Sequence, residues 1–212
     1  IRKGFRVAVC EQMESPAEAK KRGSKSVVRR DVVRLVTPGT LTEDSLLEAR
    51  RHNYLAAFSV VRDQAALAWV DISTGAFHVM ALATVRLGPE LARLAPSEVI
   101  LSDATFDAYA PIIEESGAAA TLLSRASFDS TAAEGRILSL FSVNTMDAFG
   151  SFDRAEVSAM GAIVDYLDIT QKGKLPLLAR PVKELATRVM QIDAATRRNL
   201  EITQSLTGGG RS

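Results

Sequence analysis

Few residues of this sequence belong to the types that build disulfides, metal sites or membrane spans. Cys10 is the single cysteine among 212 residues, so an internal disulfide cannot form, which is typical of a protein of the reducing cytosol. The two histidines, His52 and His78, have no second cysteine or histidine at ligand spacing, so we expect no metal site. No apolar run approaches the roughly 18 residues of a transmembrane helix, and no stretch has the pattern of a signal peptide. These absences predict a cytoplasmic chain without a membrane segment.

Signatures of covalent chemistry and of nucleotide binding are also missing. Cys10 ends an apolar run that begins at Phe5, which predicts a buried strand and an inert thiol rather than a nucleophile. The sequence contains no Gly-x-Ser-x-Gly motif. The glycines at 208–210 follow a predicted helix and lack the lysine of a phosphate-binding loop, so we expect no ATP site in this chain.

The net charge of +1 hides a strong asymmetry along the chain. Residues 1–34 contain ten lysines and arginines against four acids, whereas residues 53–150 contain five basic and eleven acidic residues. The first segment is therefore suited to face the phosphates of a nucleic acid. The second segment would repel them.

The hydrophobic pattern of the first half predicts strands with one helix near the start. Ser15–Glu18 is typical of a helix start with proline at its first position, and Val27–Val36 is a β-branched strand that stops at the Pro-Gly turn Thr37–Thr40. Three further β-rich runs predict two tight antiparallel hairpins. These runs are Tyr54–Val61, Ala66–Ser73 and Ala76–Ala83.

Strands and helices then alternate, which predicts a mixed sheet flanked by helices. The expected elements are a helix at Glu90–Leu94, a strand at Glu98–Leu101, a helix at Phe106–Ser116, a strand at Ala118–Leu123 and a helix at Thr131–Phe141. Thr131 and Glu134 predict a capping box for the last of these. Two later helices, Ala155–Ile169 and Met190–Leu206, cannot bury their apolar stripes on each other alone, so we expect them to open a separate helical unit.

Three segments of the sequence have a distinctive order of residues. The first is Gly4–Gln12, and the second runs from Val27 to Phe58 as a basic strand, the turn Thr-Pro-Gly-Thr, an acidic tether and a new apolar strand. The third is Met190–Glu201, with the sequence MQIDAATRRNLE. Together these segments resemble the MutS family of bacterial DNA mismatch-recognition proteins.

The resemblance implies an α/β chain in three parts. Residues 1–40 correspond to the C-terminal part of an α+β mismatch-binding domain, and residues 41–150 to a tether and a connector domain with a ribonuclease H-like mixed sheet. Residues 151–212 correspond to the first helices of a core or lever domain. The resemblance also implies that this chain links the mismatch-binding clamp to the ATPase core without catalysis of its own. ATP and magnesium would bind the parent protein outside this chain.

The partners that the resemblance implies are mismatched double-stranded DNA, MutL and a second copy of the parent protein in a homodimer. The connector is the expected contact for MutL. Lys25, Arg29 and Arg30, on or beside the basic strand, are the expected contacts to DNA phosphates. A basic surface that only faces solvent is the competing interpretation. The family reads mismatches with a Phe-x-Glu motif, which this sequence lacks, so we expect no discrimination of mismatches by this segment alone.

A metal-dependent nuclease is the alternative function for a ribonuclease H-like sheet. Asp71 lies where such a fold would place its first carboxylate, and Asp103 is the best partner, ahead of Asp147 and Asp153. Two metal ions about 3.5–4 Å apart would need these acids to converge. The competing interpretation, which we prefer, is that Asp71 caps the turn formed by Ser73, Thr74 and Gly75.

Overall fold

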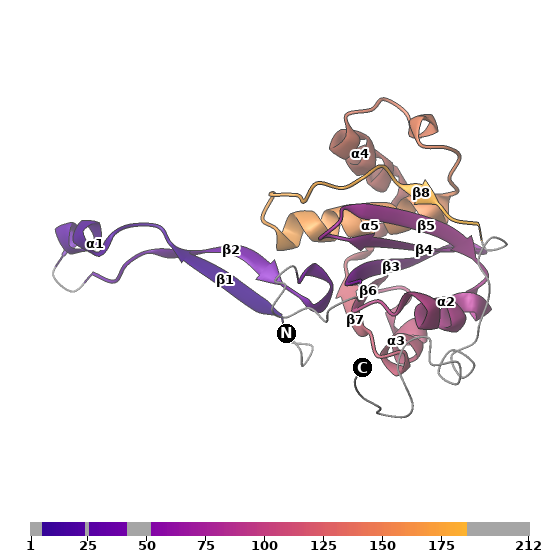
Figure 1. Ribbon diagram of the computed structural model, residues 1–212, viewed down its shortest axis with the longest axis horizontal. Helices are drawn as coiled ribbons and strands as arrows, with labels where there is room; N and C mark the ends of the chain where they lie inside the picture. The colour runs from indigo at the N-terminus through magenta and orange to yellow at the C-terminus, as the bar shows by residue number, and fades with distance from the viewer. Residues whose placement is uncertain (1–5, 24–25, 42–51, 186–212) are drawn as a thin grey trace, which may run out of the picture.

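The structure of this chain, a computed structural model, describes residues 6–23, 26–41 and 52–185. The described residues before position 42 form an arm, and those from position 52 form an α/β domain (Figure 1). The arm contains β1 (Val7–Gln12), α1 (Pro16–Arg22), β2 (Arg30–Val36) and the 3-10 helix η1 (Pro38–Thr40). The α/β domain contains β3 (Tyr54–Val61), β4 (Gln64–Asp71), β5 (Ala76–Leu82), η2 (Thr84–Arg86), α2 (Leu87–Leu94), β6 (Glu98–Ser102), α3 (Phe106–Glu115), β7 (Ala119–Leu123), η3 (Arg125–Phe128), α4 (Ser130–Phe141), η4 (Met146–Ala148), α5 (Arg154–Thr170) and β8 (Val182–Lys183).

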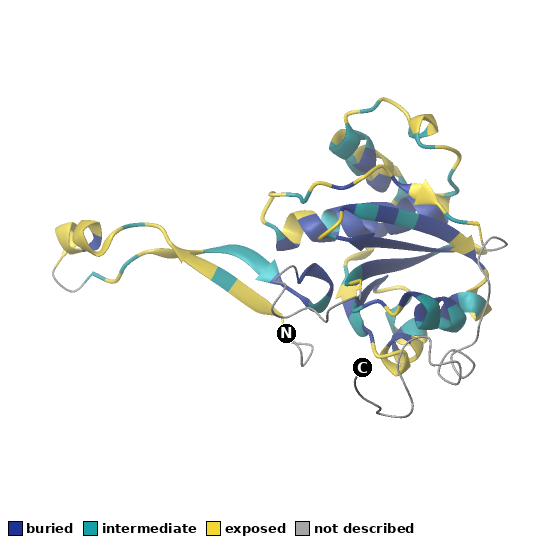
Figure 2. Ribbon diagram, viewed as in Figure 1, coloured by how far each residue is buried: buried dark blue, intermediate teal, exposed yellow. Residues whose placement is uncertain are grey.

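The arm is a two-stranded antiparallel ribbon with a short helix at its far end. β1 pairs with β2 from Val7 opposite Val36 to Gln12 opposite Arg30. Nearly all of β1 is exposed, as Figure 2 shows. The prediction that Cys10 is a buried thiol is therefore wrong, since this residue is exposed. The physical reason is that a two-stranded ribbon has no second layer to cover its side chains.

Six strands of the α/β domain form one mixed sheet in the order β7-β6-β3-β4-β5-β8. β3, β4 and β5 are antiparallel neighbours, which confirms the two predicted hairpins. β6 runs parallel to β3, β7 parallel to β6, and β8 parallel to β5. The predicted mixed sheet with flanking helices is therefore confirmed. Among the described residues, no helix has the length and apolar character needed to cross a bilayer.

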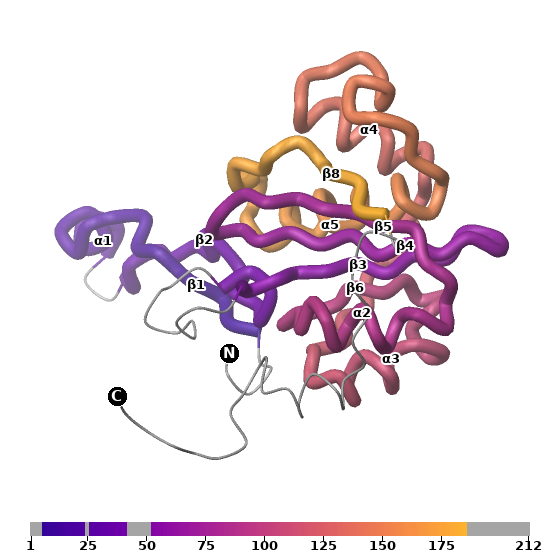
Figure 3. Tube along the Cα trace, turned by 45° about the vertical axis from the view of Figure 1, so that its right-hand side comes forward, coloured from indigo at the N-terminus to yellow at the C-terminus, as the bar shows by residue number. Residues whose placement is uncertain are grey.

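Helices cover both faces of this sheet, with α4 and α5 on one side and α2 and α3 on the other (Figures 1 and 3). Side chains alternate between the two faces along each strand. Val70 of β4, for example, packs with the α5 side, whereas its neighbour Trp69 packs with the α2 side. Because both faces are buried, the central strands are almost continuously apolar rather than alternating.

α5 belongs to the core of the α/β domain. Its residues from Ala155 to Val164 are all buried, and the helix packs against β3, β4 and α4. The expectation that Ala155–Ile169 opens a separate helical unit is therefore wrong, because the sheet supplies the surface on which this helix buries its side chains. The second helix of that expectation, Met190–Leu206, lies outside the described residues.

Two predicted helix starts differ from the observed ones. The N-cap of α4 is Asp129, whose Oδ1 accepts a hydrogen bond from the Ala132 backbone N–H at 2.8 Å. Thr131 already lies inside the first turn, so the capping box predicted with Glu134 does not form. α2 begins at Leu87 rather than after Pro89, and proline is tolerated there because N–H groups of the first turn have no partner within the helix.

The arm joins the α/β domain through η1, which packs against β3 and β6. Glu98 at the start of β6 is completely buried. Its carboxylate accepts hydrogen bonds from the Thr37 hydroxyl and the Gly39 N–H of the turn that ends the arm. The Pro-Gly turn predicted from the sequence is therefore also the attachment point of the arm.

We predict that Gly161→Ala destabilises the α/β domain by about 1–3 kcal/mol, the usual cost of overpacking. A Cβ atom at this position of α5 would lie 2.2 Å from the Cβ of Ala133 in α4. Urea unfolding followed by circular dichroism would measure the change. Gly135→Ala is the matched control, since a Cβ at that helical position meets nothing within 4 Å and should stabilise by up to about 1 kcal/mol. Equal effects of the two substitutions would contradict the close contact between α4 and α5.

Candidate nucleic-acid interface

Basic side chains gather at the far end of the arm. α1 lies at the end away from the α/β domain (Figure 1), and its last turn carries Lys20, Lys21 and Arg22. Arg29 and Arg30 follow where the chain returns from α1 into β2. All five residues are exposed. The tip of the arm therefore presents a concentration of positive charge to solvent.

Local capping explains why this tip is folded rather than an open loop. The Ser15 hydroxyl accepts a hydrogen bond from the Glu18 N–H, and the Glu18 carboxylate accepts from the Ser15 N–H at 2.8 Å, which completes a capping box. Pro16 occupies the first helical turn, as the sequence predicts. The basic residues lie in the last turn, where positive charge interacts favourably with the helix dipole.

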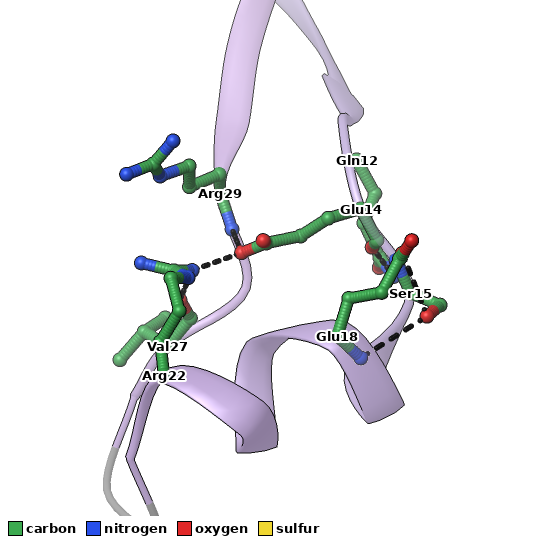
Figure 4. Close-up of polar contacts among 7 residues, drawn as sticks. All are labelled: Gln12, Glu14, Ser15, Glu18, Arg22, Val27 and Arg29. Atoms are coloured by element: carbon green, nitrogen blue, oxygen red, sulfur yellow. Dashed lines mark hydrogen bonds and ion pairs between the residues drawn. The ribbon is translucent and has the colours of Figure 1, made fainter.

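Glu14 ties the helix to the returning strand (Figure 4). Its Oε1 accepts a hydrogen bond from the Arg29 backbone N–H at 2.8 Å and forms an ion pair with the Arg22 guanidinium. The Arg29 N–H, together with Arg22, holds the pKa of Glu14 below its ordinary value. One acid thus fixes the spacing between the last turn of α1 and the first basic residues of the strand.

The three residues predicted to contact DNA phosphates differ in how the structure places them. Arg29 uses its backbone to bind Glu14, while its side chain points away from that carboxylate (Figure 4). Arg30 is exposed at the first position of β2. Within the described ranges, neither guanidinium has an ion pair with another side chain. Lys25 lies outside the described residues. The geometry thus leaves two of the three predicted side chains available to a phosphate.

Asp71 is held in a turn. Its Oδ1 accepts hydrogen bonds from the Ser73 hydroxyl at 2.5 Å and the Ser73 N–H at 3.0 Å. Its Oδ2 lies 3.0 Å from Nδ1 of His52. Burial raises the pKa of Asp71, but the hydrogen bonds from Ser73 and His52 outweigh burial and hold that pKa below its ordinary value. The carboxylate therefore caps the turn, which is the interpretation preferred from the sequence.

The acids that a nuclease would need do not converge. Asp71 ends β4 opposite Tyr54 at the start of β3, whereas Asp103 follows the end of β6, which runs parallel to β3. The two acids therefore lie at opposite ends of the sheet, about 20 Å apart at about 3.3 Å per strand residue. Asp153 caps α5 by accepting from the Glu156 N–H. No group of three or more candidate ligands among the described residues is arranged to hold a metal ion.

The two histidines have separate structural surroundings. His52 stacks on Tyr54 beside Asp71. His78 of β5 stacks on Trp69, and its Nδ1 lies 3.4 Å from Oε1 of Glu184. Each histidine thus contacts an aromatic ring and one carboxylate.

The sequence alone does not identify Glu14 and Glu98 as the acids that connect separate segments of the chain. Glu14 is one of four acids in a basic segment and lies immediately before the helix cap Ser15, and that position was the available signal. Glu98 opens a short strand that is otherwise mostly apolar, and a lone acid at such a position predicts either an exposed strand end or a specific set of donors. Only the spatial neighbours distinguish these two cases.

The described residues thus combine an exposed basic arm with a mixed α/β domain. The family model described as MutS domain II matches residues 53–179, and the model described as MutS domain I matches residues 1–45. The chain belongs to the MutS family.

Curated relatives agree with this assignment. The chain is 72% identical over 210 residues to a protein of Ruegeria sp. (strain TM1040) and 71% identical over 209 residues to one of Dinoroseobacter shibae. A third relative, from Roseobacter denitrificans, is 69% identical over 209 residues. All three are named DNA mismatch repair protein MutS. The alignments cover 99% of this chain and 24% of each relative, so the chain spans about a quarter of their length.

We predict that the backbone amide of Arg29 reports the protonation of Glu14. Because the folded pKa of Glu14 is lowered, its contribution to tip stability is complete above the ordinary pKa and disappears as pH falls through the lower, folded value. In an NMR pH titration, the Arg29 amide shift should therefore change with a midpoint below 4.5, the ordinary value for this group. Glu14→Gln should abolish that transition, whereas Glu11→Gln, at an exposed position of β1, should preserve it. A midpoint at or above 4.5 would contradict the contact.

Proposed function

We propose that this chain is part of a DNA mismatch-repair protein in which the arm contacts DNA and the α/β domain links that contact to the rest of the protein. The proposal rests on the relatives, which are named DNA mismatch repair protein MutS, and on the exposed basic tip. Mismatched double-stranded DNA is then the ligand of the parent protein. The observation that carries the DNA contact is the pair Arg29 and Arg30, exposed and without ionic partners among the described side chains.

The mode of DNA contact follows from the kind of groups available. Guanidinium and ammonium groups on an exposed surface bind phosphate oxygens, which position a duplex without reading its sequence. The Phe-x-Glu motif that reads mismatches in this family is missing from this chain. The arm therefore contributes affinity and orientation, and the discrimination of mismatches resides in other residues of the parent protein.

The α/β domain acts as a connector with a ribonuclease H-like sheet. Three antiparallel strands followed by two parallel strands with helical crossovers support this assignment. The carboxylates Asp71 and Asp103 lie at opposite ends of that sheet, so the proposed role is mechanical rather than catalytic. ATP and magnesium bind the ATPase core of the parent protein, which acts as a homodimer in the cytoplasm.

The connector also contributes to recruiting MutL. The support is its charge, because eleven acids against five basic residues between positions 53 and 150 disfavour DNA as its ligand and favour a protein partner. Exposed acids include Asp107, Glu114 and Glu115 on α3. A partner surface of positive charge would complement this helix.

We predict that Arg29→Glu with Arg30→Glu weakens duplex binding and flattens its salt dependence. Each lost phosphate contact should reduce the slope of log affinity against log salt by about one unit. Fluorescence anisotropy with a labelled duplex at several salt concentrations would measure both quantities. The control is Arg62→Glu with Arg125→Glu, which makes the same charge change at exposed positions of the α/β domain and should have a smaller effect. A salt-independent affinity of the unaltered chain would refute the phosphate role.

We predict that the whole 212-residue chain binds the N-terminal domain of MutL. Calorimetry should give heat that saturates at a defined stoichiometry. The whole chain is required, since a fragment that ends near residue 150 would lose α5 from the core. Glu114→Lys with Glu115→Lys should weaken binding, whereas Lys20→Glu with Lys21→Glu at the tip of the arm should not. An absence of heat at high micromolar concentration would contradict recruitment by this chain.

A further inference from the structure

The joint between arm and α/β domain is built on one buried carboxylate whose two oxygens face different parts of the chain. Oε2 of Glu98 accepts hydrogen bonds from the arm side, from the Thr37 hydroxyl at 2.6 Å and the Gly39 N–H at 2.9 Å. Oε1 accepts from the domain side, from the Thr121 hydroxyl at 2.6 Å and the Tyr166 hydroxyl at 2.7 Å. These four donors match the lone pairs of a carboxylate.

Burial makes this arrangement resistant to rearrangement. Glu98 has no exposed surface, and Thr37 has none either. If the turn shifted, Oε2 would lose the two donors that replace its hydration, which is costly for a buried charge. Burial and the adjacent negative charge of Glu98 also raise the pKa of Tyr166, so that its hydroxyl remains a donor up to high pH.

Two further contacts hold the same turn. Asn53 donates from Nδ2 to the Pro38 carbonyl at 3.0 Å and to the Leu41 carbonyl at 3.1 Å. Gly39 lies so close to the sheet that a Cβ would be 2.8 Å from Cδ1 of Leu55. Polar groups on both sides of the turn are therefore bound by residues of the α/β domain, and its backbone lies directly against β3.

We propose that Glu98 is a positioning residue that fixes the direction in which the arm leaves the α/β domain. The arm projects from the domain with α1 at its far end (Figures 1 and 3), so a small rotation at the turn becomes a large displacement of the basic tip. The consequence for DNA binding rests on the proposed function, whereas the rigid joint itself does not. Glu98 contributes no contact to DNA and acts through Thr37 and Gly39.

A distance measurement tests the joint without DNA. The native Cys10 is an exposed spin-label site on the arm, and Ala108→Cys adds a second exposed site on α3. Pulsed electron spin resonance on the doubly labelled chain should give one narrow distance distribution. Glu98→Ala and Thr37→Val should each broaden this distribution, because the acceptor or its hydroxyl donor is lost. Thr37→Ser, which keeps the hydroxyl, should restore the narrow distribution.

The matched control separates positioning from general stability. Thr121→Val removes a hydroxyl donor at the same 2.6 Å distance from the same carboxylate, but on the domain side. It should lower the unfolding midpoint about as much as Thr37→Val while leaving the distance distribution narrow. Equal broadening by both substitutions, or no broadening by Thr37→Val, would overturn the proposal.

Duplex affinity gives an independent second readout. If the arm binds DNA, Thr37→Val should reduce the affinity of the chain for a long duplex, and Thr37→Ser should restore it. A broadened distribution with unchanged affinity would support the joint while removing the arm from the proposed DNA contact. A narrow distribution in Thr37→Val would reject the joint whatever the affinity.

Discussion

The buried carboxylate of Glu98 is the interaction on which the arrangement of this chain depends. A carboxylate can be removed from water only where donors replace the lost hydration. Glu98 obtains two donors from the turn at the end of the arm and two from the α/β domain. The same group therefore stabilises the start of β6, keeps the Tyr166 hydroxyl oriented and attaches the arm. Because two of these donors belong to the arm and two to the domain, Glu98 joins the two parts at this turn.

The mixed sheet determines how the helices of the α/β domain are arranged. Its central strands are apolar on both faces, so both faces require a helical layer. α2 and α3 supply one layer, and α4 and α5 supply the other. The close approach of Gly161 to Ala133 allows α4 and α5 to share the second face. This requirement explains why α5 is part of the α/β domain although its sequence, taken alone, is typical of a helix in a bundle.

The arm is stabilised by different interactions from those of the α/β domain. It has no core of its own, and it holds its shape through backbone pairing, the capping box of α1 and the bridge from Glu14 to Arg22 and Arg29. Its charge is concentrated at the tip, away from the acidic α/β domain. Separating positive from negative segments in space reduces their mutual neutralisation, so the positive potential at the tip remains available to a polyanion. A role in holding DNA at one end and a protein partner at the other agrees with this distribution.

The sequence by itself determined the elements that local chemistry controls. The start of α1, both antiparallel hairpins, the Pro-Gly turn and the alternation of strands with helices follow from capping residues, β-branched runs and turn residues. The resemblance to the MutS family follows from Gly4–Gln12, Val27–Phe58 and Met190–Glu201. The exposure of Cys10, the placement of α5 and the separation of Asp71 from Asp103 were decided by the tertiary structure. Each of these depends on which layer covers a face or on the direction in which a distant strand runs. The roles of Glu14 and Glu98 belong to the same group, because an acid's function depends on donors that lie far away in the sequence and meet only in the folded chain.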